Sequence, residues 1–206
     1  MLRNTVIFIF LLLSFLSVNG QKKQDSISTQ ETPLAFGNFS FGYTNGSVKG
    51  YSFGLNVNYQ EKNNLFTFKT LTTVDIQEVN WLLFFPIFVK SSITNEYSLL
   101  YGKRYIKGGF SYHFSGGVSY NFTEIINNGV ETNDSYIGLP LEIGLRFFKS
   151  KKKRFGVLFG LIPVGKPTAF GRSIGLKLYA NVSKKSYFGF GLTFGLGFHK
   201  VYENEI

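Results

Sequence analysis

The sequence predicts an all-β protein: a single antiparallel up-and-down transmembrane β-barrel, following a cleaved N-terminal signal peptide. Three observations predict this fold: an apolar N-terminal stretch, a high content of glycine, phenylalanine and tyrosine, and five segments in which apolar and polar residues alternate. A period of two is that of a β-strand. Membrane barrels place apolar side chains outward and polar ones in the lumen. We therefore expect a protein of the Gram-negative cell outer membrane.

The first twenty residues have the three-part pattern of a secretory signal peptide. Met1–Asn4 is positively charged, Val6–Leu16 is almost wholly apolar, and small residues precede the polar stretch after Gly20. A membrane-spanning helix needs roughly 20 apolar residues, so we expect cleavage after Gly20 rather than a retained anchor. Residues 21–32 are polar and predict a disordered periplasmic leader. The barrel domain is then 33–206, and the absence of cysteine excludes disulfides and a lipid-modified N-terminus.

The alternating segments distinguish a membrane barrel from a soluble sandwich. In Tyr51–Tyr59 one face is wholly apolar, while the interleaved residues are Ser, Gly and Asn. The other four segments are Phe110–Phe122, Ile137–Phe147, Ile174–Val182 and Phe188–Phe198. A sandwich core is close packed by large apolar groups, whereas a narrow lumen tolerates Ser, Asn, Gly, Glu and Arg. The apolar faces are therefore assigned to lipid, and a soluble sandwich with these faces as its core is the alternative.

The pattern predicts eight strands. They are Leu34–Thr44, Ser47–Gln60, Leu65–Gln77, Asn95–Tyr105, Gly108–Thr123, Ser135–Lys149, Gly171–Ser183 and Ser186–Lys200. An even number places both ends of the barrel sequence in the periplasm. Asn45-Gly46 predicts a two-residue hairpin turn, with further tight connections at Lys62–Asn64, Lys107 and Lys184-Lys185. The longer connections, 78–94 and 124–134, then lie on the extracellular side.

A barrel of ten strands is the alternative. Phe155–Val164 has the composition of a ninth strand, and Trp81–Val89 would supply the tenth. Pro86 argues against this, because proline lacks the N–H that a central strand donates.

These features resemble the small outer-membrane barrels of the OmpX-like and OmpA-transmembrane-domain-like group. The resemblance rests on the signal peptide, the glycine-rich and aromatic-rich alternation and the strand count. The stretches Ser98–Tyr105 and Gly138–Ile143 are similar to those of uncharacterised Bacteroidota outer-membrane proteins. The resemblance covers essentially the mature chain and implies an architecture, because members of this group differ in function.

The predicted inward faces carry charges of both signs. The members of this lumen charge network are Lys69, Glu96, Arg104, Glu142, Arg146 and Lys177. An eight-stranded barrel has room inside only for its own side chains, so we interpret them as a network that plugs the lumen. A narrow ion path or a ligand site lined by the same groups is the alternative.

The two histidines predict neither an enzyme nor a metal site. His113 has Ser111 and Ser115 two positions away but is predicted to face the lumen, whereas a lipid hydrolase must present its triad to lipid. His199 has no serine within two positions, and the adjacent His-Ser pair of lipid-A deacylases is absent. Two distant histidines without thiols are a poor metal site. We expect no catalysis, metal or cofactor.

Two exposed segments are candidates for contact with lipid or a partner. Lys151, Lys152, Lys153 and Arg154 belong to a basic run in a chain of net charge +10; such a run is a solvated turn or contacts lipid phosphates or an anionic periplasmic partner. An exported barrel has no ordinary access to nucleic acid. The stretch around Trp81, Phe84, Phe85 and Phe88 is too apolar for a solvated loop. It extends the neighbouring strands, caps the barrel or contacts a partner.

These inferences give three functional hypotheses. The first is a monomeric structural or interaction barrel that is surrounded by outer-membrane lipids and displays loops to an unknown partner. The second is a narrow, porin-like channel for small solutes or ions. The third is a lipid-modifying outer-membrane enzyme.

Overall fold

The computed structural model describes residues 33–82, 85–127, 130–157 and 162–202. The predicted signal peptide and the whole of the predicted leader, 21–32, therefore lie outside the described residues. The described residues form ten strands: β1 (Leu34–Gly46), β2 (Gly50–Glu61), β3 (Asn64–Leu82), β4 (Phe85–Lys107), β5 (Phe110–Asn127), β6 (Val130–Phe148), β7 (Lys153–Val157), β8 (Ile162–Thr168), β9 (Phe170–Ser183) and β10 (Tyr187–Phe198). No helix among the described residues is long and apolar enough to cross a membrane.

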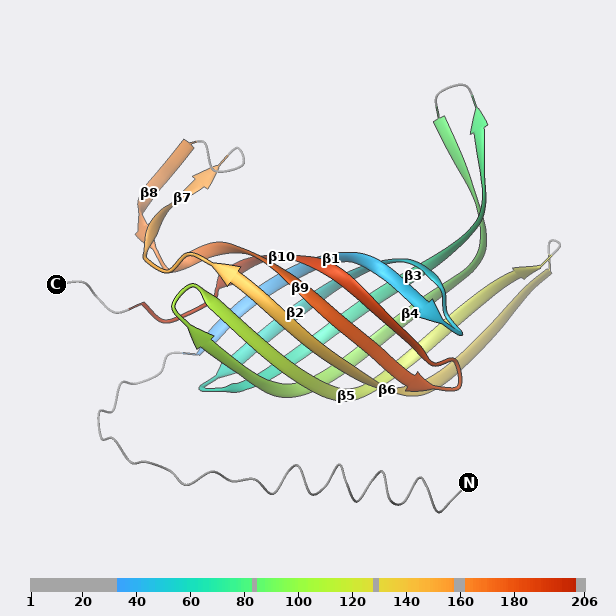
Figure 1. The fold of residues 1–206 in the computed structure, drawn as a ribbon, viewed down its shortest axis with the longest axis horizontal. Helices are drawn as coiled ribbons and strands as arrows, with labels where there is room; N and C mark the ends of the chain where they lie inside the picture. The colour runs from blue at the N-terminus through green and yellow to red at the C-terminus, as the bar shows by residue number, and fades with distance from the viewer. Residues whose placement is uncertain (1–32, 83–84, 128–129, 158–161, 203–206) are drawn as a thin grey trace, which may run out of the picture. The chain divides into compact units, whose positions relative to one another are not determined.

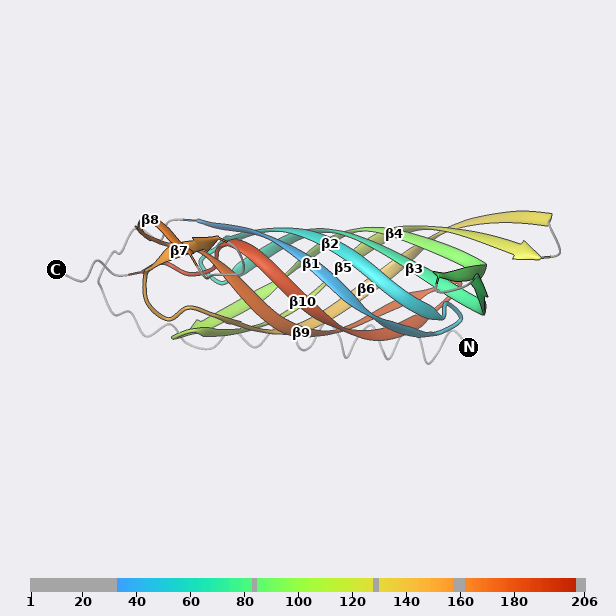
Figure 2. The same ribbon diagram turned by 90° about the horizontal axis from the view of Figure 1, so that it is seen from above.

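Eight of these strands close into one antiparallel barrel in the order β1-β10-β9-β6-β5-β4-β3-β2 (Figure 1). The strands run obliquely to the long axis of the barrel (Figure 2), as closure of a sheet requires. The predicted eight-stranded barrel is confirmed. One end of the barrel, here called the hairpin end, carries the β1–β2, β3–β4, β5–β6 and β9–β10 connections. The opposite end, here called the terminal end, carries the start of β1 and the end of β10.

The strands alternate in exposure as the sequence predicted. Ile137 on the outer face is 75% exposed, whereas Asn121 on the inner face is fully buried. In β2 every second residue is buried from Gly50 to Gln60. Successive side chains of a strand point to opposite faces, so one choice of register fixes which residues face the lumen along the whole strand. The assignment of apolar faces to the outside is confirmed.

Two pairs of strands are longer than predicted. β3 pairs with β4 as far as Leu82 and Phe85, and β5 pairs with β6 as far as Asn127 and Val130. The prediction of loops over 78–94 and 124–134 was therefore wrong. Pro86 is accommodated because it lies opposite Trp81, while the described pairing of β4 with β5 begins only at Ser92. A proline is tolerated where one edge of the strand has no ladder to donate to.

The predicted turn at Asn45-Gly46 was also wrong. β1 continues through Gly46, which pairs with Tyr187 of β10, and the connection to β2 is formed by 47–49. Gly46 has a φ of 130°, a conformation that glycine adopts without the steric cost of a Cβ. The later turn allows Val48 to be buried in a cluster with Leu71, Tyr179 and Tyr187. Burial of these apolar side chains outweighs the local preference of Asn-Gly for a tight turn.

The segment between β6 and β9 forms a separate two-stranded sheet. β7 pairs with β8 and not with the barrel. The ten-stranded alternative is therefore wrong, because Phe155–Val164 joins this hairpin and Trp81–Val89 lengthens β3 and β4. The connection leaves β6 after Phe148, so it belongs to the terminal end of the barrel.

Candidate functional site

The six predicted lumen charges are all buried, with relative exposures between 1% and 4%. They come from β3 (Lys69), β4 (Glu96, Arg104), β6 (Glu142, Arg146) and β9 (Lys177). The structure separates them by their contacts into two groups. We call Lys69, Glu96, Glu142 and Lys177 the lysine–glutamate cluster, and Arg104 with Arg146 the arginine cluster.

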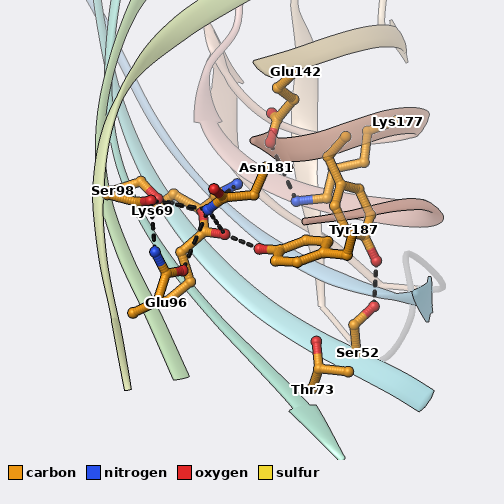
Figure 3. A network of polar contacts seen from close by, with 12 residues as sticks. Ser52, Lys69, Thr73, Glu96, Ser98, Glu142, Lys177, Asn181 and Tyr187 are labelled. Atoms are coloured by element: carbon orange, nitrogen blue, oxygen red, sulfur yellow. Dashed lines mark hydrogen bonds and ion pairs between the residues drawn. The ribbon is translucent and has the colours of Figure 1, made fainter. Parts of the chain in front are cut away.

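Glu96 is the centre of the lysine–glutamate cluster (Figure 3). Its Oε1 lies 2.8 Å from Lys69 Nζ and accepts a hydrogen bond from the Ser98 hydroxyl. Its Oε2 accepts hydrogen bonds from Asn181 Nδ2, at 2.9 Å, and from the Tyr187 hydroxyl. These donors come from β3, β4, β9 and β10. A buried carboxylate needs such a set of donors to offset the loss of water.

Glu142 holds the second half of the same cluster. Its Oε2 lies 3.5 Å from Lys177 Nζ, and its Oε1 lies 3.3 Å from His113 Nε2. The ring of Tyr179 links the two halves, because Lys69 Nζ and Lys177 Nζ lie 5.8 and 5.3 Å from its centroid. The cluster therefore joins two lysines and two carboxylates, so its formal charges balance.

The arginine cluster differs because its partners are neutral. Arg104 donates from Nε to Ser111 Oγ, at 3.1 Å, and from Nη1 to Gln60 Oε1, at 2.7 Å. Arg146 donates from Nη1 to Asn38 Oδ1. Within the described part of the chain, neither guanidinium forms an ion pair with a carboxylate. The prediction of one network therefore needs this refinement: the six charges form two groups.

Aromatic rings pack against the arginine cluster. The guanidinium carbons of Arg104 and Arg146 lie 4.7 and 4.6 Å from the centroid of the Phe36 ring. His199, the residue after β10, packs on Phe36 and Phe148 with ring centroids 5.1 and 5.6 Å apart. Burial, and then the charges of Arg146 and Arg104, lower the pKa of His199 to about 3. His199 is therefore uncharged at neutral pH and adds an apolar face to the cluster.

Several residues that complete these clusters carry no motif by which the sequence would reveal them. They are Phe36, Asn38, Gln60, Tyr179, Asn181 and Tyr187. Their only signal in the sequence was parity, that is, the odd or even position along a strand that decides to which face a side chain points. Each of them occupies an inward position of an alternating strand. Parity says that a side chain faces the lumen but not which side chain it meets there.

His113 is buried and faces the lumen, as predicted. Its described polar contact is with Glu142, and Ser111 instead accepts from Arg104. In the described part of the chain no three or more His, Asp or Glu side chains gather as metal ligands do. That the protein is not an enzyme and binds no cofactor stays a prediction.

Some of the predicted contact residues lie outside the part of the protein that the structure describes. These are the side chains of Trp81, Phe84, Phe85, Phe88 and Lys153. Lys151, Lys152 and Arg154 are exposed in the connection that contains β7. Their contact with lipid or a partner stays a prediction.

The outer surface of the barrel is apolar around its circumference. Leu55 is 61% exposed and Val118 is 56% exposed. Other large apolar side chains that are about half exposed or more include Leu99, Leu139, Leu178, Phe190 and Phe194. Soluble monomers do not expose an apolar surface of this extent, whereas a membrane barrel requires one.

No protein-family model and no curated protein sequence matches this chain. Among solved structures, the N-terminal β-barrel domain of OprF from Pseudomonas aeruginosa is similar, with a TM-score of 0.51 and 12% identity over 81% of this chain and all of that one. Ail of Yersinia pestis, in complex with the heparin analogue sucrose octasulfate, has a TM-score of 0.50 at 12% identity over 81% of this chain and 98% of Ail. Both comparisons show the fold of small outer-membrane barrels. With the apolar outer surface, they place this barrel in the outer membrane; the resemblance to Bacteroidota proteins stays a prediction.

Proposed function

We propose that this protein is a monomeric outer-membrane barrel with a plugged lumen, which displays two β-hairpins on the cell surface for interaction with a partner. The observation that carries the proposal is the length of the β3–β4 and β5–β6 ladders. In this orientation the hairpin end faces the outside and the terminal end faces the periplasm. The β2–β3 and β4–β5 connections at the terminal end are short, as periplasmic turns of barrels are, and the third connection there is the longer segment that contains β7 and β8.

Both ladders continue where their neighbouring strands have stopped (Figure 1). The pairing of β2 with β3 ends at Tyr51 and Val74, yet β3 continues to pair with β4 up to Leu82. The pairing of β6 with β9 ends at Gly138 and Ser183, yet β6 remains paired with β5 back to Val130. Among the described strands, β3 beyond Val74 pairs only with β4, and β6 before Gly138 pairs only with β5, while β5 stays paired with β4 as far as Ile125. The outer edges of β3 and β6 are therefore available for contact.

The plugged lumen is inferred from the two clusters and the apolar cover at the hairpin end. The charged side chains reach across the barrel from β3, β4, β6 and β9, and Val48 is buried with Leu71, Tyr179 and Tyr187. An eight-stranded barrel has an interior just wide enough for side chains to fill. These features favour a structural or interaction role over a channel.

The remaining partners follow from the same arrangement. Outer-membrane lipids contact the apolar outer surface, and the closed part of the barrel, without the two hairpin extensions, has no free edge through which a second copy would pair. The apolar sequence Trp81–Val89, in which β3 ends and β4 begins, suits contact with lipid or a protein. The basic run Lys151–Arg154 belongs to the terminal end and suits anionic groups in the periplasm.

The display of the hairpins is testable with an epitope tag inserted between Leu83 and Phe84. We expect antibody to bind intact cells that express this variant, because the β3–β4 tip then faces the medium. The matched control carries the same tag between Gly108 and Gly109, in the β4–β5 turn at the terminal end, and should bind antibody only after the outer membrane is permeabilised. Binding of antibody to intact cells with the control alone would reverse the proposed orientation and contradict the proposal.

The channel hypothesis is tested by conductance in planar bilayers. We expect no stable conductance steps from the refolded protein, because buried side chains occupy the lumen. The refolded state is verified on the same sample by its shifted mobility in SDS gels without boiling. Reproducible unitary steps from the folded sample would show that the lumen conducts and would favour the narrow channel instead.

A further inference from the structure

The lumen carries an excess of buried positive charge. Among the buried side chains of the described residues, four are Lys or Arg and two are Glu. Both carboxylates lie in the lysine–glutamate cluster, where each pairs with a lysine. Glu142 also attracts Arg146, but its charge is already matched by Lys177. The arginine cluster therefore adds two cations to a lumen whose buried carboxylates, among the described residues, are both paired with lysines. A buried charge without a counter-charge is costly, so this cluster has the electrostatics of an anion site.

The Arg104 guanidinium retains unused donor capacity. Arg104 uses Nε and Nη1, but its Nη2 is buried and has no hydrogen-bond partner among the described residues. The hydroxyl of Ser173 on β9 is likewise buried and unpaired. Buried donors normally have partners. An anion that accepts from Nη2 would satisfy Arg104 and supply the missing charge.

The walls next to the arginine cluster are lined by glycine. Phe36, whose ring lies under both guanidinium groups, pairs in register with Gly197 of β10, and Gly197 pairs with Gly171 of β9. Gly171 faces inward, and no atom lies within 4 Å of the position that a Cβ would occupy there, its chain neighbours aside. At Gly195 and Gly197 the space is already filled, because a Cβ would clash with Ser173 Oγ at the first position and with Phe36 Cα at the second. Of these three glycines, Gly171 alone leaves open room in the lumen at this end of the barrel.

We propose that the arginine cluster binds a small free oxyanion of the phosphate or sulfate type in the lumen, near the terminal end of the barrel. Guanidinium groups present paired N–H donors that match the oxygens of such anions. The basic connection that begins with Lys149 belongs to the same end and raises the local concentration of anions. This proposal concerns the lumen and does not depend on what the hairpins bind.

The test measures the temperature at which the folded gel band is lost, in a non-ionic detergent at constant ionic strength. The samples contain either inorganic phosphate or sulfate, or the bulky sulfonate MES as the reference anion. A ligand that binds only the folded state raises this temperature in a saturable way. We expect such a rise in the wild type, and at least a tenfold higher half-saturating concentration in Arg146→Met, because charge-assisted hydrogen bonds are lost.

The control variant is Lys107→Gln, which removes an exposed cation from the last residue of β4 at the same end of the barrel. Its half-saturating concentration should equal that of the wild type. If Arg146→Met does not fold, Arg146→Lys takes its place, because it keeps the charge but loses the paired N–H donors of the guanidinium group. Calorimetric titration of the wild type with phosphate should give one site. The absence of saturable stabilisation in the wild type, or its loss in Lys107→Gln but not in the arginine variants, would overturn the proposal.

A lipid headgroup carries the same phosphate chemistry, so a further arm replaces free phosphate with phosphatidylglycerol in the mixed micelle. Stabilisation by free phosphate without the lipid supports the lumen site. Stabilisation by the lipid alone would assign the effect to the outside of the barrel and would overturn the site.

Discussion

Glu96→Gln is expected to lower the free energy of unfolding by about 3–5 kcal/mol, because it leaves the buried Lys69 ammonium group without its paired carboxylate. Lys69 and Glu96 are each 1% exposed, and their charged atoms lie 2.8 Å apart. Glutamine keeps the size of the side chain, so the loss reflects charge rather than a cavity. Urea unfolding of protein refolded into lipid vesicles measures the effect.

Two further variants show whether the pairing itself is responsible. The double variant Lys69→Met/Glu96→Gln removes both charges and should recover most of the lost stability, as a double-mutant cycle requires for coupled groups. Glu61→Gln changes an exposed carboxylate at the end of β2 and should stay within about 0.5 kcal/mol of the wild type. If Glu96→Gln were as mild as Glu61→Gln, the lysine–glutamate cluster would not stabilise the barrel.

Leu141→Arg is expected to destabilise the folded protein by about 2–4 kcal/mol, since it places a charge against the hydrocarbon core of the bilayer. Leu141 lies on the outer face of β6, between Gly116 of β5 and Ala180 of β9, and is 52% exposed. Vesicle refolding followed by urea unfolding gives the change in free energy.

The control for the depth of the charge in the bilayer is Tyr105→Arg. Tyr105 lies on the outer face close to the end of β4. Near the interface such a charge costs about 0–1 kcal/mol. A large effect at both positions would indicate a general loss of packing, and a small effect at Leu141 would show that the outer face does not meet lipid.

The faces of the strands were predictable from the sequence because parity is a local property. Once Leu55 is outward, Asn56 must be inward, and the same reasoning placed Glu142 and Arg146 in the lumen. The lengths of β3 to β6 were not predictable in this way. Their outer parts, including Glu78 and Asn133, are held by backbone hydrogen bonds within a hairpin, which form whether or not the side chains alternate.

The segment after Phe148 shows a second limit. Phe155–Val164 has a strand-like composition, and its residues do form strands, but composition does not say which partner a strand takes. β7 and β8 pair with each other because they are adjacent in sequence and their connection is short, while β6 and β9 close the barrel without them.

By itself, the sequence determined that this chain is an eight-stranded barrel with an apolar exterior and a charged lumen, because strand period and composition are written residue by residue. Only the tertiary structure decided which charges meet. Lys69 pairs with Glu96 on the neighbouring strand, and Asn38 accepts from Arg146, 108 residues away. Such contacts depend on the stagger of the closed barrel, which brings distant strands to the same level of the lumen. That closure brings the two arginines together without an ion-paired carboxylate among the described residues, an arrangement that no local pattern in the sequence contains.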